Sequence, residues 1–286
     1  MKFFIPSHKR SNLLMKYTLG CLVNYGIKKD DIFIFVDFSQ QEEYKKTCGE
    51  HANIISFNDT GIGSARYYIQ LFAQDKQIQY GFILDDDLQT LLYKSEKAPK
   101  GWWHNKYIRD TDTAQKYLSR MEDDCLSRSE ILVGLTPRRV MHLDKPDIFS
   151  NGHPYGFYWL NFKKLKDMDI WYDHNMDHFE DYDITFQLLE IGYNTKLYRD
   201  LGFSSFVIGT LEGGCYNNYQ TKDLLSKARM LELRYQNIGI KLIEREIKNK
   251  SGQNNLSFKI KWIKKKYVFI LQQEDFLGSI TKKVVD

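Results

Sequence analysis

Short apolar runs alternate with helically spaced apolar residues along the first part of the chain. Lys2 to Ile5, Asp31 to Asp37 and Asn53 to Phe57 each carry an apolar run that predicts a strand. Asn12 to Tyr25 has leucine and tyrosine side chains at helical spacing, and Gln41 to Cys48 predicts a shorter helix. This order predicts a parallel sheet whose ligands bind beyond the carboxyl ends of the strands.

Strands and helices continue to alternate through the middle of the chain. A helix ending at Asp75 precedes the buried strand Phe82 to Leu84, and Leu91 to Asp112 is predicted to be irregular. The further predicted strands are Ile131 to Leu135, Phe157 to Asn161 and Tyr193 to Tyr198, and the further predicted helices are Thr113 to Ser127 and Ile184 to Ile191.

The last part of the chain has a different pattern. Leu224 to Ile247 predicts one long helix with a brief interruption at Gly239, and Lys248 to Asn255 has the composition of a linker. Phe258 to Tyr267 alternates lysines with apolar residues, which predicts a strand with one cationic face. We therefore predict an α/β domain over residues 1–247 and a small basic extension over residues 248–286.

Composition sets broad limits on the class of protein. The 286 residues are 42% hydrophobic and 15% aromatic, which allows one large domain with a sizeable core, and the net charge of +4 identifies no partner. Four widely separated cysteines without a C-x-x-C pair predict reduced thiols in an intracellular protein. Because the chain has no signal peptide and no run of the ~20 apolar residues that a membrane helix needs, we expect a soluble, cytoplasmic protein without a membrane partner.

Three consecutive carboxylates, Asp85 to Asp87, directly follow the strand Phe82 to Leu84. Such a cluster is costly at the end of a buried strand unless a cation shares it. Alternate carboxylates suit a hard divalent ion that keeps open positions for substrate phosphates. We therefore predict that Asp85 and Asp87 hold Mg²⁺ or Mn²⁺, and that the ion holds a nucleotide diphosphate. An acidic turn or a helix cap would use the same residues.

Polar and basic residues lie at the predicted carboxyl ends of the neighbouring strands. Ser7 to Arg10 follow the first strand, Asp37 ends the second, and the stretch Gly61 to Arg66 opens a helix with two glycines that let backbone amides approach an anion. A plain loop and surface salt bridges are the simpler alternatives. The predicted nucleotide-contacting residues are Pro6, Ser7, Arg10, Asp37, Gly63, Arg66, Asp85 and Asp86.

A second acidic cluster, His178 to Asp183, opens an amphipathic helix. Acidic residues at a helix N-terminus are favoured by capping and by the helix dipole, so a purely structural role is the alternative. Three carboxylates and a histidine exceed what capping requires, and a carboxylate beside a pocket can act as a general base. Glu180 and Asp181 are therefore the candidate catalytic residues.

Aromatic, polar and basic residues supply candidates for binding the second substrate. The tryptophans beside lysines in Leu91 to Asp112 suit a nucleic-acid backbone with a displaced base, a mobile lid or core packing. The polar loop 151–156 suits an acceptor pocket or a structural hairpin, and the C-terminal lysines suit phosphates or the guarding of an edge strand. The candidate acceptor-binding residues are Trp102, Trp103, His153, Tyr155, Lys264 and Lys265.

These landmarks together resemble a nucleotide-sugar glycosyltransferase of the GT-A type. The Asp85 to Asp87 triplet is similar to the acidic metal motif that follows a strand in that fold, and Glu180 and Asp181 are similar to the later Glu-Asp pair of inverting enzymes. The resemblance implies a Rossmann-like, mixed sheet flanked by helices. It also implies that Asp181 is the catalytic base, with Glu180 as the second candidate, and it identifies no third metal ligand.

Three motifs in order resemble, more narrowly, the TET/JBP-associated glycosyltransferases. They are Ile5 to Arg10 (Ile-Pro-Ser-His-Lys-Arg), Gly61 to Arg66 (Gly-Ile-Gly-Ser-Ala-Arg) and Ile83 to Leu88 (Ile-Leu-Asp-Asp-Asp-Leu). This resemblance implies transfer of a sugar from a nucleotide diphosphate sugar, expected to be a UDP-sugar, to a hydroxymethylated pyrimidine base such as hydroxymethylcytosine in bacteriophage DNA. A phage-encoded chain would then act in the host cytoplasm.

Two other functions fit the same residues. One is a GT-A glycosyltransferase that acts on a glycan or a small molecule, and the other is a non-catalytic module that keeps the fold and binds nucleic acid. A phosphoryl-transfer enzyme could also use an Asp triplet, but the chain has no P-loop motif.

Overall fold

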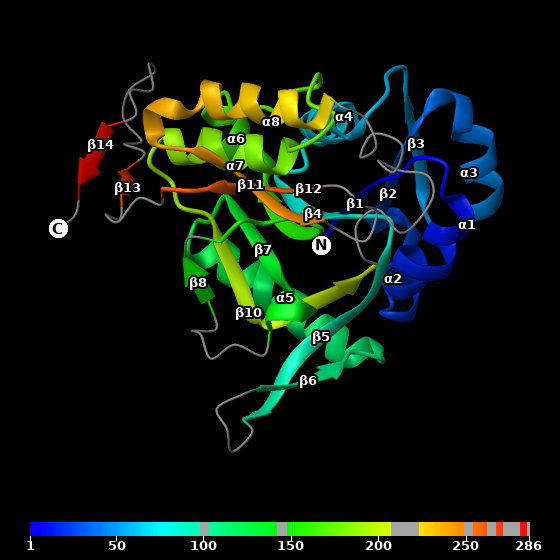
Figure 1. Ribbon diagram of the computed structural model, residues 1–286. Coiled ribbons are helices and arrows are strands. Elements are labelled where there is room, and N and C mark those ends of the chain that lie inside the picture. The colour runs from blue at the N-terminus through cyan, green and yellow to red at the C-terminus, as the bar shows by residue number, and fades with distance from the viewer. Residues whose placement is uncertain are drawn as a thin grey trace.

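The computed structural model describes residues 1–97, 103–141, 148–150, 152–206, 223–248, 254–261, 267–270 and 281–284. A ten-stranded mixed sheet lies at its centre (Figure 1), and this confirms the predicted fold class. Its strands are β1 (Phe3–Pro6), β2 (Ile32–Asp37), β3 (Asn53–Phe57), β4 (Tyr80–Leu84), β5 (Leu88–Lys97), β6 (Trp103–Tyr107), β7 (Leu132–Pro137), β8 (Ile148–Ser150), β9 (Phe157–Asn161) and β10 (Lys196–Ser205).

The strand order is β3-β2-β1-β4-β9-β7-β10-β5-β6, with β8 paired to β10. The first four strands pair in parallel, as predicted from the alternation of strands and helices. The antiparallel strand β9 then joins β4 to β7, and β10 runs parallel to β7. Because β1, β2 and β4 end at the same edge, the polar residues that follow them meet there.

Helices cover both faces of the sheet. They are α1 (Ser11–Leu14), a π-helical turn (Met15–Leu19), α2 (Gly20–Asn24), α3 (Gln41–Cys48), α4 (Ile62–Asp75), α5 (Thr111–Ser127), α6 (Phe162–Asp167), α7 (Glu180–Glu190) and α8 (Asp223–Arg234). Successive side chains of β1 enter different cores: Phe3 packs with residues of α2 and α5, and Phe4 packs with residues of α4 and α7. Both faces of this parallel strand are therefore buried, which explains its continuous apolar run.

The prediction that Leu91 to Asp112 is irregular is wrong. β5 and β6 form an antiparallel hairpin within it, and Leu92 pairs with Tyr107. Leu91 and Leu92 are buried because β5 also pairs with β10 and extends the main sheet. The lysines and polar residues along both strands conceal this pattern in the sequence.

The prediction of one helix over Leu224 to Ile247 is also wrong. α8 ends at Arg234, Gly239 takes a left-handed conformation with φ of +79°, and β11 (Lys241–Lys248) follows. β11 pairs antiparallel with β12 (Asn254–Lys259). β11 therefore continues across the predicted domain boundary between residues 247 and 248. β12 starts earlier than the predicted strand, whose residues 262–266 lie outside the described part of the chain.

Two further features complete the described structure. β13 (Tyr267–Ile270) and β14 (Thr281–Val284) form a separate two-stranded sheet. Within the described ranges, every helix is too short or too polar to cross a membrane.

Candidate active site

The Asp85–Asp87 turn between β4 and β5 is fixed at both ends by one threonine. The Thr18 hydroxyl donates to the carbonyl of Asp85 at 2.9 Å and accepts from the amide of Leu88 at 2.8 Å. Thr18 is fully buried and lies in the π-helical turn, a feature that is frequent at functional sites. The amide of Asp85 also donates to the carbonyl of Gly156 at 2.8 Å, so the turn is tied to two elements.

Thr18→Val is expected to destabilise the protein by about 1–3 kcal/mol, because it leaves a buried amide and a buried carbonyl without their partner. Urea unfolding of the variant measures this loss. Thr18→Ser keeps the hydroxyl and is the matched control. Equal stability of the valine variant and the wild type would show that the hydroxyl does not hold the turn.

Asp86 belongs to a buried network that joins the ends of β1 and β4. Its carboxylate accepts from the hydroxyl of Ser7 at 2.7 Å and pairs with the guanidinium of Arg10 at 3.1 Å. The hydroxyl of Tyr44 contacts Ser7 at 2.7 Å and accepts from the backbone amide of Arg10 at 2.9 Å. Three of the predicted nucleotide-contacting residues, Ser7, Arg10 and Asp86, therefore lie together, and Asp86 accepts a hydrogen bond from Ser7 and pairs with Arg10.

Arg66 joins the two acidic clusters that the sequence places far apart. Its guanidinium pairs with Asp85 at 3.1 Å and with Glu180 at 2.7 Å, and only 3% of the residue is exposed. It also lies 5.5 Å from the ring centroid of Tyr158. Nucleotide phosphates were the partner predicted for Arg66, whereas in this structure carboxylates from the end of β4 and the start of α7 surround it.

The other predicted nucleotide-contacting residues lie at the same edge. Pro6 ends β1, and Asp37 ends β2 and caps the following turn by accepting from the amide of Ser39 at 2.7 Å. A Cβ atom at Gly63 would lie 2.2 Å from the carbonyl oxygen of Met176. Close packing of α4 against that segment is therefore sufficient to explain the glycine.

Glu180 and Asp181 open α7 in different electrostatic environments. Burial raises the pKa of Glu180 to about 7, against the opposing charge of Arg66 and with a contribution from the charge of Asp181. Burial also acts on Asp181, but a contact with Nε2 of His153 at 3.1 Å and the charge of Arg66 outweigh it and lower the pKa. The Asp181 side chain is 22% exposed and that of Glu180 is 8% exposed. Asp181 is thus the more accessible and the more readily ionised of the two.

Asp85 and Asp87 fit a divalent cation. Burial, reinforced by the charges of Asp85 and Asp86, raises the pKa of Asp87 to about 7, and Asp87 forms no ion pair with any described residue. Burial and the charge of Asp181 similarly raise the pKa of Asp85, against the charge of Arg66. Oxygen ligands with excess negative charge suit Mg²⁺ or Mn²⁺. No cluster of three potential metal ligands occurs among the described residues.

The loop before β9 brings two predicted acceptor-binding residues to this edge. His153 stacks on Tyr182 with ring centroids 3.7 Å apart, and Tyr155 accepts a hydrogen bond from Arg139 at 2.9 Å. The contact between His153 and Asp181 was missed from the sequence, because 28 positions separate the two residues and no local pattern links them. Trp102, Lys264 and Lys265 lie outside the described residues, and Trp103 starts β6.

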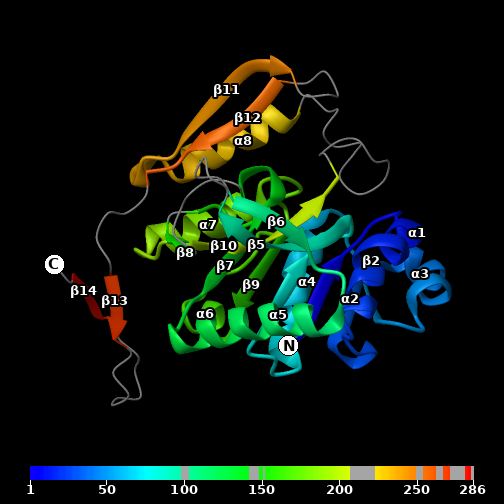
Figure 2. The same cartoon turned by 90° about the horizontal axis from the view of Figure 1, so that it is seen from below.

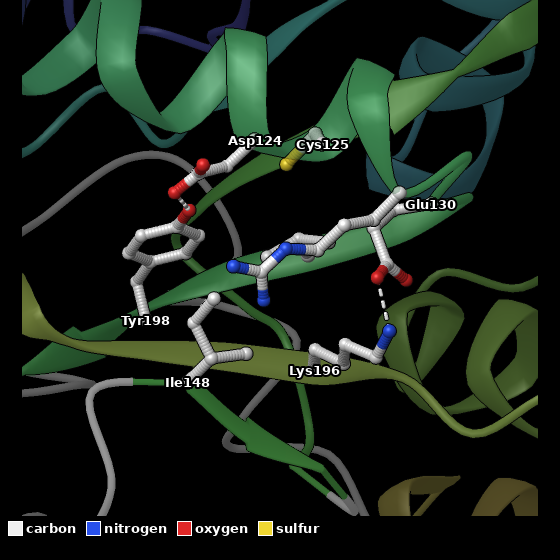
Figure 3. Close-up of a pocket in the computed structure, with 8 residues that line it drawn as sticks. Asp124, Cys125, Glu130, Ile148, Lys196 and Tyr198 are labelled. Atoms are coloured by element: carbon white, nitrogen blue, oxygen red, sulfur yellow. Dashed lines mark hydrogen bonds and ion pairs between the residues drawn. The ribbon is translucent and has the colours of Figure 1, made fainter.

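A separate small pocket lies between α5, β7, β8 and β10 (Figure 3). Four of its polar groups pair with one another: the hydroxyl of Tyr198 donates to Asp124, and Lys196 forms an ion pair with Glu130. None of the predicted site residues lines it. The edge that carries Asp85 and Asp181 is therefore the candidate active site.

The mixed sheet, the acidic turn after β4 and the Glu-Asp pair at the start of α7 define a glycosyltransferase fold of the GT-A type. A model of the TET-Associated Glycosyltransferase family matches residues 1–210. The chain belongs to this family of glycosyltransferases, which confirms the resemblance found in the sequence. No protein of curated function matches the chain.

Solved structures with a similar fold include GalNAc-T7 with UDP, GalNAc and Mn²⁺. That match has a TM-score of 0.51 at 11% identity and covers 81% of this chain and 47% of the other. S. aureus TarS matches with a TM-score of 0.48 at 11% identity, over 82% of this chain and 65% of the other. This chain thus spans about half to two thirds of the two chains compared, of which the second is residues 1–349 of TarS.

Proposed function

We propose that this protein transfers a sugar from a UDP-sugar to a hydroxymethylated pyrimidine in phage DNA, with inversion at the anomeric carbon, in the host cytoplasm. The observation that carries the proposal is the pair of contacts made by Arg66, which links a candidate metal-binding carboxylate to the candidate base segment. UDP and Mn²⁺ in the GalNAc-T7 structure support the choice of donor and cation.

The chemistry divides between the two acidic clusters. Asp85 and Asp87 would hold the cation, which when bound neutralises the departing diphosphate. Asp181 removes the proton from the acceptor hydroxyl as its oxygen attacks the anomeric carbon from the face opposite the leaving diphosphate. Because a hydroxymethyl group is barely acidic, the reaction needs both a positioned base and an activated leaving group. A base in duplex DNA must also leave the stack to reach this edge.

One experiment tests this proposal. The protein is incubated with Mn²⁺, a panel of nucleotide sugars and DNA containing hydroxymethylated pyrimidines, and the nucleosides are analysed by mass spectrometry. We expect a glycosylated nucleoside with a UDP-sugar, and none with the double variant Asp85→Asn, Asp87→Asn. Transfer only to glycans or free sugars would refute the DNA acceptor, and a product formed equally by the double variant would refute the metal site.

The exposed face of the β11–β12 hairpin supports a DNA acceptor. Residues 223–286 contain 14 Lys and Arg against seven Asp and Glu, whereas the whole chain has a net charge of only +4. Lys241 and Lys259 are exposed and pair directly across the two strands, although like charges in that position are destabilising. Lys261 is also exposed, and none of these three lysines forms an ion pair with a described residue. Nucleic-acid phosphates would offset this repulsion.

Replacing Lys259 and Lys261 by glutamine is expected to weaken DNA binding and to reduce the slope of log affinity against log salt by about one for each phosphate that no longer binds a lysine. Binding is measured by fluorescence anisotropy at several salt concentrations. Lys45→Gln and Lys163→Gln, on the surfaces of α3 and α6, are the matched controls. An unchanged salt slope in the hairpin variant would count against this surface.

A further inference from the structure

The C-terminal unit α8–β11–β12 lies beyond residues 1–210 and packs on the helix that carries the candidate base (Figure 2). Phe258 of β12 is 8% exposed and inserts among three aromatic side chains of the base segment. Its ring centroid lies 5.5 Å from that of Phe179, 4.8 Å from that of Tyr182 and 5.5 Å from that of Phe186. A single side chain of the hairpin therefore contacts residues on both sides of Glu180 and Asp181.

Phe179 has an unusual backbone conformation directly before the two carboxylates. Its φ is +65°, in the left-handed region, which is uncommon for a bulky non-glycine residue. Its ring meets that of Phe258 edge-on, with an interplanar angle of 89°. Since α7 starts at the next residue, the conformation of Phe179 sets the direction in which Glu180 and Asp181 leave the chain.

Tyr182 extends the contact from the hairpin to the base itself. The Tyr182 ring contacts the ring of Phe258. It also stacks on the ring of His153, with ring centroids 3.7 Å apart and an interplanar angle of 12°. Nε2 of His153 contacts the Asp181 carboxylate at 3.1 Å, and the amide of Tyr182 donates to the other carboxylate oxygen at 2.8 Å. Phe258, Tyr182, His153 and Asp181 thus form a continuous series of contacts.

Polar contacts fasten the same unit to α7. Asp183, which is fully buried and lies two residues after the candidate base, accepts hydrogen bonds from Arg234 at 2.9 Å and from the hydroxyl of Tyr235 at 2.8 Å. Lys227 of α8 pairs with Asp177 at 2.8 Å, just before the start of α7. The unit is therefore held against the base segment by several independent interactions.

We infer that the α8–β11–β12 unit is part of the catalytic apparatus, and that Phe258 is a positioning residue that holds Asp181 in place through Phe179, Tyr182 and His153. This inference rests on the proposed function, in which Asp181 is the base. Phe258 acts through its ring contacts with Phe179 and Tyr182, which flank the two carboxylates. One two-stranded element then has two roles. Its outer face carries the lysines proposed to bind DNA, and its inner face carries Phe258, which positions the base.

Phe258→Ala is the direct test. We expect kcat to fall by about 100-fold, the loss typical of a small misplacement of a catalytic group, while KM for the UDP-sugar stays unchanged. Phe258→Leu keeps a buried apolar side chain and should show a smaller fall. Leu233→Ala removes an exposed apolar side chain from α8 of the same unit, and it is the control for side-chain truncation outside the contact with Phe179 and Tyr182. Thermal unfolding confirms that each variant is folded.

A second readout does not depend on activity. The stacked ring of Tyr182 shifts the NMR signals of the His153 ring protons by its ring current, and Tyr182→Ala gives the reference for its loss. Phe258→Ala should move these signals toward that reference, and Leu233→Ala should not. Unchanged signals with wild-type kcat would overturn the inference. If Phe258→Ala moves the His153 signals but Asp181→Asn still transfers sugar, the contacts of Phe258 are confirmed and the proposal that Asp181 is the base is wrong.

Discussion

Asp181→Asn is expected to lower the transfer rate by about 10²- to 10⁴-fold, the contribution typical of a general base, while UDP-sugar binding stays within a few-fold of the wild type. Asparagine has nearly the same shape, so it can still accept from the amide of Tyr182 and contact His153, but it cannot take up the proton of the acceptor. Single-turnover kinetics measures the chemical step, and calorimetry with UDP measures binding.

Two controls make this result specific. Asp75→Asn changes an exposed carboxylate at the end of α4 and should leave transfer unchanged. Glu180→Gln tests the second candidate for the base. Because the Glu180 carboxylate is buried and paired with Arg66, we expect this variant to lower the stability of the protein more than its transfer rate. Full turnover by Asp181→Asn together with an inactive but folded Glu180→Gln would move the base to Glu180.

The sheet edge that holds the candidate site was predictable because its signals are local. Each early strand is a continuous apolar run buried on both faces, and the residues after β1, β2 and β4 must meet at one edge of a parallel sheet. Even the acidic turn could be located from the cost of placing three carboxylates after a buried strand. The position of the candidate active site follows from these two facts.

The connections within the site were not predictable, because they depend on which distant side chains fill the same space. Arg66 reads as a phosphate ligand beside two glycines, yet Gly63 is explained by the carbonyl of Met176 and Arg66 by carboxylates from β4 and α7. The pairing of His153 with Asp181 has no sequence spacing that would reveal it. Such contacts are set by tertiary packing, on which local periodicity carries no information.

The two wrong secondary-structure predictions have physical causes of the same kind. β5 and β6 carry many charged and polar residues, and their pairing with each other and with β10 decides their conformation. Beyond Gly239, helical spacing and strand alternation are both compatible with Ile240 to Ile247. The left-handed glycine and the pairing of Leu242 with Phe258 select the strand.

Arg66→Met is expected to lower the free energy of unfolding by about 3–5 kcal/mol, because it leaves Asp85 and Glu180 near each other without their shared cation. For a domain of this size, that loss corresponds to a fall in Tm on the order of 10 °C. Arg229→Met, which breaks a single exposed ion pair with Glu244, is the matched control and should cost less than about 1 kcal/mol.

The pH dependence of the Arg66→Met deficit separates electrostatics from reduced packing. Glu180 already has a folded-state pKa raised to about 7, mainly by burial, and removing the opposing charge of Arg66 raises this pKa further. A carboxyl whose pKa is raised by folding stabilises the fold at low pH and loses that stabilisation as pH rises through the folded-state pKa. The deficit relative to the wild type should therefore be larger at pH 8 than at pH 5, as measured by chemical unfolding at both values. A deficit of the same size at both would mean that Arg66 acts through packing on Tyr158, and that the two acidic clusters do not depend on its charge to share one site.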